Sequence, residues 1–294
     1  MKTDLLLRSA ALLCLVGSTS QMEAQNRDGA AVFQAVCSTC HREGSTVQAP
    51  LPEVLRRMPV QAILTALETG KMASIAAGLS SAERAAVAGY LGVAGAESIP
   101  QSAHCSGSTP LEKNAPAWNG WGIDLTNSRY QNAKAAGLAA ADVPKLKLKW
   151  AFGYPGVTTA FGNPTVFGGR IFVGSADGTV FSLNAQSGCI HWTYKATEGV
   201  RTGAVISSDG KTAYLSDLHA WVHAVNAETG AMLWKTHVDE TLHASIAGTP
   251  KLDGGRLYVP VTGGEEHLTA ADPSYVCCKI RGTLVALDAK TGKS

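Results

Sequence analysis

The sequence predicts an all-α domain followed by an all-β propeller. A pair of cysteines with a histidine directly behind it lies in a helix-forming stretch near the N-terminus. Further along, Trp150, Trp192 and Trp234 recur at intervals of 42 residues among short β-branched runs and glycine turns. A repeat of about that length, with four strands in each unit, is typical of propeller blades. A length of 294 residues also suits two domains.

The composition excludes one class of function and favours one kind of structure. The formal net charge is +2, well short of the basic field of a typical nucleic-acid-binding protein, so no nucleic-acid partner is expected. The chain has 31 glycines and only 16% charged residues. That balance suits turn-rich β structure better than a helical bundle.

Residues 1–25 are expected to be a signal peptide. Lys2 and Arg8 give a positively charged start, Ala10–Val16 is a short apolar run, and Gly17–Ser20 supplies small residues for cleavage. A membrane anchor is the alternative, but a run of seven residues is too short for a span, which needs about 20. The sequence therefore predicts export to the periplasm without a stable membrane anchor.

Cys37, Cys40 and His41 form the C-x-x-C-H pattern of covalent c-type haem attachment. Two thiols three positions apart, which we expect at the start of a helix, can reach the two vinyl groups of one porphyrin, and His41 then faces the iron. A zinc site would need a second ligand pair, but residues 42–103 contain no Cys or His. A redox Cys-x-x-Cys motif would need a βαβ context, which this region lacks.

The sixth ligand of the haem iron is expected to be Met72. No histidine follows His41 within the helical region, which leaves Met58 and Met72 as candidates. Met58 ends a short predicted helix before Pro59, where packing against the core is the simpler role. Met72 lies in a loop ahead of Ser80, which can cap the next helix.

Residues 26–93 thus resemble a small class I cytochrome c domain, in which a loop methionine precedes a capped C-terminal helix. The resemblance implies haem c attached to Cys37 and Cys40, with His41 and Met72 as iron ligands. Ala73 stands where that family often has a proline after the ligand methionine.

Residues 94–117 are predicted to be a linker, because Gly, Ser, Pro and Ala dominate there. Residues 118–294 are predicted to be a partial propeller. The stretches Leu183–Trp192 and Val225–Trp234 align, and a third copy begins at Leu287. Because Gly230 and Gly292 of the second and third copies are 62 positions apart rather than 42, the last repeat holds an insertion of about 20 residues.

Within one unit, Asp-Gly between two alternating runs predicts a hairpin of Arg170–Gly174 and Thr179–Leu183. Each repeat tryptophan is expected to wedge between adjacent blades, in equivalent places, and none is expected to be catalytic.

The repeat resembles the propeller of pyrroloquinoline quinone (PQQ) enzymes, which carries an Ala-x-Thr-Gly-x-x-x-Trp docking pattern. The segments Trp118–Gly122, Asn127–Tyr130 and Leu146–Trp150 are similar to the first outer strands of that family. With a cytochrome domain in front, the chain looks most like the cytochrome-type polyvinyl-alcohol dehydrogenases, which are PQQ-dependent quinohaemoprotein alcohol dehydrogenases. That family has eight blades and this chain holds about three, so it looks like a C-terminally truncated fragment.

Cys277 and Cys278 are adjacent, and an exported protein can join such a pair in a vicinal disulfide. In PQQ alcohol dehydrogenases such a ring lies against the quinone, and a following Arg-Gly grips a PQQ carboxylate, which implies that role for Arg281. The alternative to this disulfide is that Cys277 and Cys278 are free thiols or pair with other cysteines. Arg201 could also meet an acidic cofactor, or be a solvated or inter-blade arginine.

Two further features stay open at the level of sequence. Glu265 and Glu266 could approach the quinone or its Ca²⁺, or belong to a solvated loop. A Cys105–Cys189 disulfide could pin the linker to the first blade, although spacing alone does not establish connectivity.

The resemblance implies a periplasmic enzyme in which PQQ, assisted by Ca²⁺, takes two electrons from a secondary alcohol and a c-type haem passes them on singly to a redox partner. The alcohol would be similar to polyvinyl alcohol, and the product a ketone. The catalytic base is not located, and this chain alone is expected to be inactive. The alternatives are an electron-carrier cytochrome on a propeller scaffold without cofactor, or an inactive remnant.

Overall fold

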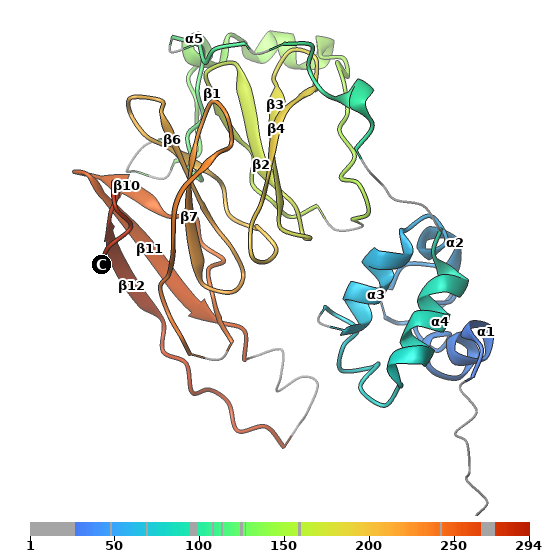
Figure 1. The fold of residues 1–294 in the computed structure, drawn as a ribbon. Helices are drawn as coiled ribbons and strands as arrows, with labels where there is room; N and C mark the ends of the chain where they lie inside the picture. Colours follow the sequence, from blue (N-terminus) through green and yellow to red (C-terminus); the bar gives the residue numbers. More distant parts are fainter. Residues whose placement is uncertain are drawn as a thin grey trace, which may run out of the picture.

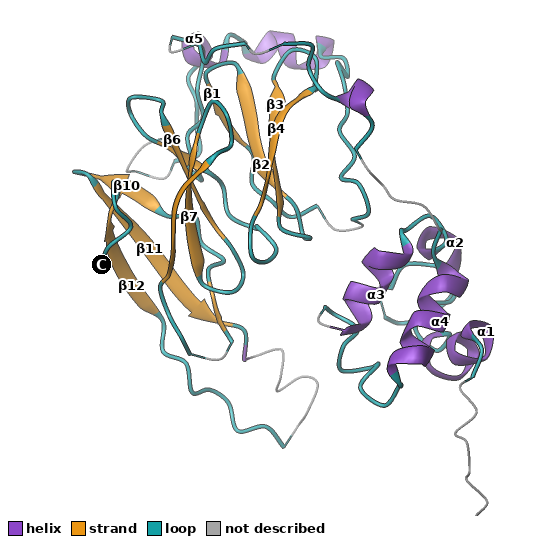
Figure 2. Ribbon diagram, viewed as in Figure 1, coloured by secondary structure: helices purple, strands orange, loops and turns teal. Residues whose placement is uncertain are grey.

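The computed structural model describes residues 27–294, except for 48, 69, 94–98, 108, 113, 124–125, 127, 158–159, 242 and 266–273. The predicted signal peptide lies outside the described residues. Figure 1 shows helices in the first part of the chain and β-sheets in the remainder, and Figure 2 shows the same division by secondary structure. Within these ranges, no helix combines the length and the apolar character needed to cross a bilayer.

Residues 27–93 fold as short helices around one apolar core. The helices are α1 (Gly29–Val32), the π-helical segment η1 (Phe33–Cys37), α2 (Pro52–Leu55), α3 (Val60–Glu68) and α4 (Ser81–Leu91). Helices α1 and α4 approach closely: a β-carbon on Gly29 would lie 2.1 Å from the carbonyl oxygen of Ala86. Only glycine permits that crossing.

The predicted cap of the last helix is present. Ser80 Oγ accepts a hydrogen bond from the backbone N–H of Glu83 at 3.2 Å, and Glu83 Oε2 accepts one from the backbone N–H of Ser80 at 3.0 Å. This reciprocal pair satisfies two N–H groups at the start of the helix. Arg27 Nε also donates to Glu83 at 2.7 Å, which ties the beginning of the described chain to the last helix.

Parts of the segment between the helices and the sheets, such as Ile99, Ala103 and Trp150, pack against the first sheet. The segment contains the short helices η2 (Gln101–Ala103), α5 (Ala133–Ala136) and η3 (Ala140–Lys145). A disulfide joins Cys105 to Cys189, the pairing that the sequence left open. The backbone N–H of Cys105 also donates to the carbonyl of Ile190 at 3.0 Å, so this segment is fixed to the sheet both covalently and by hydrogen bonding.

The described residues of the remainder form three four-stranded antiparallel sheets in an open arc (Figures 1 and 2). In the first two sheets each strand pairs with the next along the chain; in the third, β10 and β9 both pair with β11, which also pairs with β12. The predicted hairpin is confirmed as β2 and β3 around the Asp-Gly turn. The strands are β1 (Thr165–Phe167), β2 (Arg170–Gly174), β3 (Thr179–Asn184), β4 (Ile190–Lys195), β5 (Val205–Ile206), β6 (Thr212–Ser216), β7 (Trp221–Asn226), β8 (Met232–His237), β9 (Ala244–Ser245), β10 (Lys251–Asp253), β11 (Arg256–Gly263) and β12 (Thr283–Asp288).

The repeat tryptophans occupy equivalent places, as predicted. The indole N–H groups of Trp150, Trp192 and Trp234 donate to backbone carbonyls at 3.2, 3.1 and 3.2 Å. Each ring also lies against a glycine with positive φ in the turn of the following repeat. The accepting residues are Ala185, Ala227 and Ala289, and the glycines are Gly188, Gly230 and Gly292. The tryptophans therefore join successive repeats.

The lead-in segment differs from the expected outer strand. Trp118 pairs with Val166 of β1, and the side-chain amide of Asn119 exchanges hydrogen bonds with the backbone of Ile206 in β5, at 2.7 and 2.8 Å. Residues 118–119 thus bridge the first strands of two sheets. The side chain of Asn119 replaces a peptide unit there, a role that strand propensity does not reveal.

Several turns and connections of the three sheets meet at one end of the sheets. The β2–β3 and β6–β7 turns, the β4–β5 connection and the β11–β12 connection all leave from this end, because neighbouring strands are antiparallel. Backbone hydrogen bonds link the two turns to the β4–β5 connection: Val200 donates to Ser175 at 2.9 Å, and Leu218 donates to Gly199 at 3.0 Å. We call this the junction end of the sheets.

Candidate functional site

His41 is oriented by a backbone carbonyl. The residue is 9% exposed, and Nδ1 lies 2.7 Å from the carbonyl oxygen of Pro50. A carbonyl can only accept, so Nδ1 donates, and in the neutral tautomer that fits this contact Nε2 carries the lone pair. A histidine held in this way presents Nε2 to a metal, as iron ligation requires.

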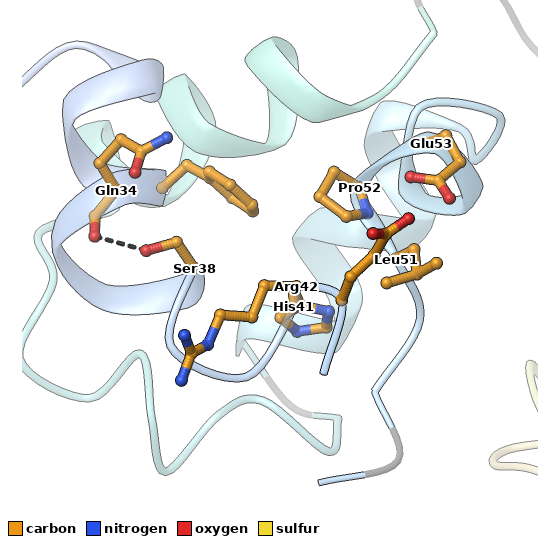
Figure 3. A pocket seen from close by; sticks show the side chains of 9 residues that line it. Gln34, Ser38, His41, Arg42, Leu51, Pro52 and Glu53 are labelled. Atoms are coloured by element: carbon orange, nitrogen blue, oxygen red, sulfur yellow. Dashed lines mark hydrogen bonds between the residues drawn. The ribbon is translucent and has the colours of Figure 1, made fainter. Parts of the chain in front are cut away.

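An open cavity of about 520 Å³ adjoins His41 (Figure 3). Its walls come from η1, from the cysteine motif and the turn after it, and from the start of α2. Apolar and charged side chains both contribute, so the cavity suits a group with an apolar body and polar edges. The lining residues are Phe33, Gln34, Ser38, His41, Arg42, Glu43, Leu51, Pro52 and Glu53.

The two cysteines of the motif are free thiols, and both are half-buried. Cys37 is the last residue of η1, so the motif lies at the end of a helix rather than at its start. The backbone N–H of His41 donates to the carbonyl of Cys37 at 3.0 Å, which closes a turn and brings thiols and imidazole together. Burial, and then the nearby Cys40, raise the pKa of Cys37.

Both candidate methionines pack against the helical core on which Cys37 also lies. Helix α2 ends at Leu55, so Met58 follows the helix instead of ending it, because Arg56 and Arg57 form a turn. Met72 lies in the turns between α3 and α4, as predicted. Free thiols, an oriented imidazole and half-buried methionines are a donor set that fits haem c.

The insertion in the third repeat carries the second candidate group at the junction end. A disulfide joins Cys277 and Cys278. The Arg281 side chain is exposed, and its Nη1 donates to the carbonyl of Cys278 at 2.7 Å. The cation is thereby held against the cysteine pair.

Glu265 anchors the same insertion at its base. The side chain is 3% exposed and accepts from Tyr275 Oη at 2.5 Å and from the backbone N–H of Ile280 at 2.7 Å. These hydrogen bonds, that of Tyr275 first, lower the pKa of Glu265. The carboxylate therefore ties both ends of the inserted loop together, whereas Glu266 lies outside the described residues.

Arg201 also lies at the junction end, in the β4–β5 connection. Its guanidinium carbon is 5.9 Å from the centre of the Phe161 ring, and the residue is exposed. Two exposed guanidinium groups at one end of the arc suit a ligand with several carboxylates. Among the described residues, no group of three or more His, Cys, Asp or Glu side chains is placed to hold a metal ion.

Sequence reasoning missed the Pro50 carbonyl. It also missed a network at the junction end that joins the buried Asp217 and His223 to the half-buried Tyr194. Asp217 Oδ2 and Tyr194 Oη lie 3.0 and 2.9 Å from the two ring nitrogens of His223. A backbone acceptor has no signature in sequence, and Tyr194 belongs to a different sheet from His223. An Asp near a His in a strand pattern was the one available signal.

Two family models match the two parts of the chain. The model described as "Outer membrane protein assembly factor BamB", a PQQ-repeat family, matches residues 130–272 and 197–293. The model described as "Cytochrome C oxidase, cbb3-type, subunit III" matches residues 24–91. The helical part and the sheets therefore correspond to two distinct families.

Curated relatives cover both parts together. A polyvinylalcohol dehydrogenase from a Pseudomonas species is 39% identical over 96% of this chain and 47% of that protein. Another, from Sphingopyxis sp. (strain 113P3), is 40% identical over 92% of this chain and 44% of that protein. The chain thus spans about half the length of the curated relatives that it matches.

The solved quinohemoprotein alcohol dehydrogenase from Comamonas testosteroni covers 60% of this chain and 26% of its own, with 22% identity and a TM-score of 0.50. At that identity the likeness concerns the fold. The chain therefore belongs to the PQQ-repeat propeller family, as a homologue of the polyvinyl alcohol dehydrogenases that joins a cytochrome c domain to PQQ-type sheets.

Proposed function

We propose that this chain is the cytochrome-bearing part of a periplasmic quinohaemoprotein alcohol dehydrogenase. The observation that carries the proposal is the combination, in one chain, of an oriented histidine in a C-x-x-C-H motif with a cationic, disulfide-bearing end of PQQ-type sheets. The substrate would be a secondary alcohol similar to polyvinyl alcohol, oxidised to a ketone. Electrons would then leave through the haem to a redox partner.

In the helical domain, covering residues 26–93, Cys37 and Cys40 would attach haem c through thioether bonds. His41 would bind the iron through Nε2, since Nδ1 is engaged by Pro50, and Met72 would be the opposite ligand. A linker over 94–117 would follow, and a partial propeller over 118–294, with about three of the family's eight blades. A signal peptide over 1–25 would direct export.

At the junction end, Cys277, Cys278 and Arg281 would bind PQQ. A vicinal disulfide offers a compact apolar wall for a flat ring, and a guanidinium fork pairs with a carboxylate in bidentate fashion. Bound PQQ would supply two-electron oxidation of the alcohol. The catalytic base and the ligands of a Ca²⁺ ion would come from the remaining length of the full protein, so this chain alone would oxidise no alcohol.

Titration of the purified chain with PQQ, followed by quenching of tryptophan fluorescence, tests the quinone site. We expect weak binding that weakens further, about tenfold, in Arg281→Ala, because one charge-assisted pair is lost. The Cys277→Ala/Cys278→Ala variant should also bind less, with an unchanged haem spectrum. Arg256→Ala is the matched control, since this exposed arginine begins β11 at the opposite end.

Equal affinity in the wild type, Arg281→Ala and the double cysteine variant would contradict the site. It would favour the second candidate, an electron-carrier cytochrome on a propeller scaffold. The observation that favours that candidate is the helical domain itself, in which the expected haem-binding residues contact a core and a carbonyl of that domain.

A further inference from the structure

Asp217 is a fully buried carboxylate at the junction end, in the β6–β7 turn. Its Oδ1 accepts hydrogen bonds from the backbone N–H groups of His219 and Trp221, at 3.0 and 3.1 Å. Its Oδ2 accepts from the backbone N–H of Glu198 at 3.1 Å and faces His223 Nε2 at 3.0 Å. Burying a carboxylate is costly unless it is fully hydrogen-bonded, and four partners meet that condition.

His223 fixes the orientation of this carboxylate. An ionised carboxylate only accepts, so His223 Nε2 carries the proton and Nδ1 accepts from Tyr194 Oη, at 2.9 Å. His223 is 1% exposed, and its ring makes an edge contact with that of Tyr194 at 5.6 Å. The hydrogen bonds from Tyr194 through His223 to Asp217 therefore connect β4, the last strand of the first sheet, to the β6–β7 turn of the second sheet.

The Asp217 carboxylate and the backbones of two neighbouring turns together hold the β4–β5 connection in place. Glu198 is bonded to Asp217, the Gly199 carbonyl accepts from Leu218, and the Val200 N–H donates to Ser175. The next residue is Arg201, whose side chain is exposed. Backbone hydrogen bonds thus fix each of the three residues before the arginine, and the arginine side chain is exposed.

In the first sheet, the β2–β3 turn corresponds to the β6–β7 turn, but its aspartate has different hydrogen-bond partners. Asp177 in the β2–β3 turn bonds with Ser175, Thr179 and Lys195, all of them in or beside the strands of its own sheet. The side chain of Asp177 is also 42% exposed. A buried carboxylate that reaches across to the β4–β5 connection is therefore not a general requirement of these turns.

We infer that Asp217 is a positioning residue: through Glu198 it sets the β4–β5 connection so that Arg201 presents its guanidinium to the carboxylates of a ligand bound at the junction end. His223 and Tyr194 support it by fixing the carboxylate. The inference rests on the proposed function for the identity of the ligand, PQQ, but the placement of the connection can be measured without it.

Hydrogen exchange of the Glu198 amide in the 294-residue chain measures that placement. Asp217→Asn should accelerate it about tenfold or more, because a hydrogen bond to a charged, buried acceptor is lost. His223→Leu should act in the same direction, whereas His223→Gln, which keeps a donor for the carboxylate, should stay close to the wild type. Asp209→Asn is the matched control, because Asp209 caps a turn at the opposite end of the same sheet.

A titration with PQQ provides the second arm. Asp217→Asn should weaken PQQ binding by about the same factor as Arg201→Ala, and the double variant should be no weaker than either. Unchanged exchange at Glu198 in both Asp217→Asn and His223→Leu would overturn the inference, as would faster exchange with unchanged PQQ affinity. A wild-type chain that binds no PQQ, yet shows the expected exchange, would instead count against the proposed function.

Discussion

The indole N–H of Trp234 donates to the carbonyl oxygen of Ala289, 55 residues further along the chain, at 3.2 Å. Trp192 makes the same hydrogen bond with Ala227 at 3.1 Å. Since each ring also covers the glycine of the following turn, one side chain supplies both apolar burial and a polar link between successive repeats.

Trp192→Ala should therefore lower the free energy of unfolding by about 3–5 kcal/mol, because a 7% exposed indole is replaced by a cavity. Trp192→Phe keeps most of the apolar area and loses the hydrogen bond, so its cost should be nearer 1 kcal/mol. Urea denaturation followed by circular dichroism checks both values. Equal costs for the two variants would show that burial is not the main contribution.

The Asp177 carboxylate should give the first sheet an acid-sensitive contribution to stability. Burial raises its pKa, but hydrogen bonds from Lys195, Ser175 and Thr179 outweigh this and bring it to about 2. A folded-state pKa below the unfolded value, about 3.9, stabilises the protein above that value. The contribution is lost as the pH falls through the folded pKa.

Because both partners are largely exposed, we expect only about 1 kcal/mol from this group after solvent screening. Asp177→Asn should be less stable than the wild type at pH 7, and the difference should shrink between about pH 4 and pH 2. Urea titrations across that range measure it. A difference that stays constant with pH would rule out the carboxylate as its source.

Removing the Cys105–Cys189 disulfide should destabilise the sheets by about 2–4 kcal/mol, since this bond closes a loop with a sequence separation of 84. Cys189→Ser, compared with the wild type under oxidising and reducing conditions, gives the measurement. The Cys277→Ala/Cys278→Ala variant is the control, because adjacent residues enclose almost no chain. If reductant affects wild type and Cys189→Ser equally, the disulfide is not the stabilising element.

Met72 should be the haem ligand opposite His41. Met72→Ala should abolish the near-infrared charge-transfer band between sulfur and ferric iron, whereas Met58→Ala should retain it and cost only packing. Absorption spectra of the two oxidised variants decide between the methionines. Loss of the band in Met58→Ala alone would reverse the assignment.

Features that depend on residues close together in the sequence could be predicted from it. The 42-residue spacing of Trp150, Trp192 and Trp234 indicated repeated hairpins, and the structure places the three indoles equivalently. The Ser80 cap was equally readable, because its partner lies three residues away.

Contacts between distant parts of the chain were beyond sequence reasoning. Asn119 bonds with Ile206 across 87 positions, and Tyr194 meets His223 only because two sheets pack together. The carbonyl of Pro50 carries no side-chain signature at all. At the cysteine motif, the sequence predicts a helix start where the structure has a helix end, because a π-helical turn at Phe33–Cys37 has no clear propensity signal.

Reduction of the haem by an alcohol tests the central claim most directly. The chain would be extended to the length of its relatives, loaded with PQQ and Ca²⁺, and mixed under anaerobic conditions with a secondary alcohol while the haem absorption is followed. We predict that the ferrous spectrum grows in with alcohol and PQQ both present, and that Arg281→Ala slows its appearance. A haem that stays oxidised with alcohol and PQQ, yet is reduced at once by ascorbate, would contradict the account.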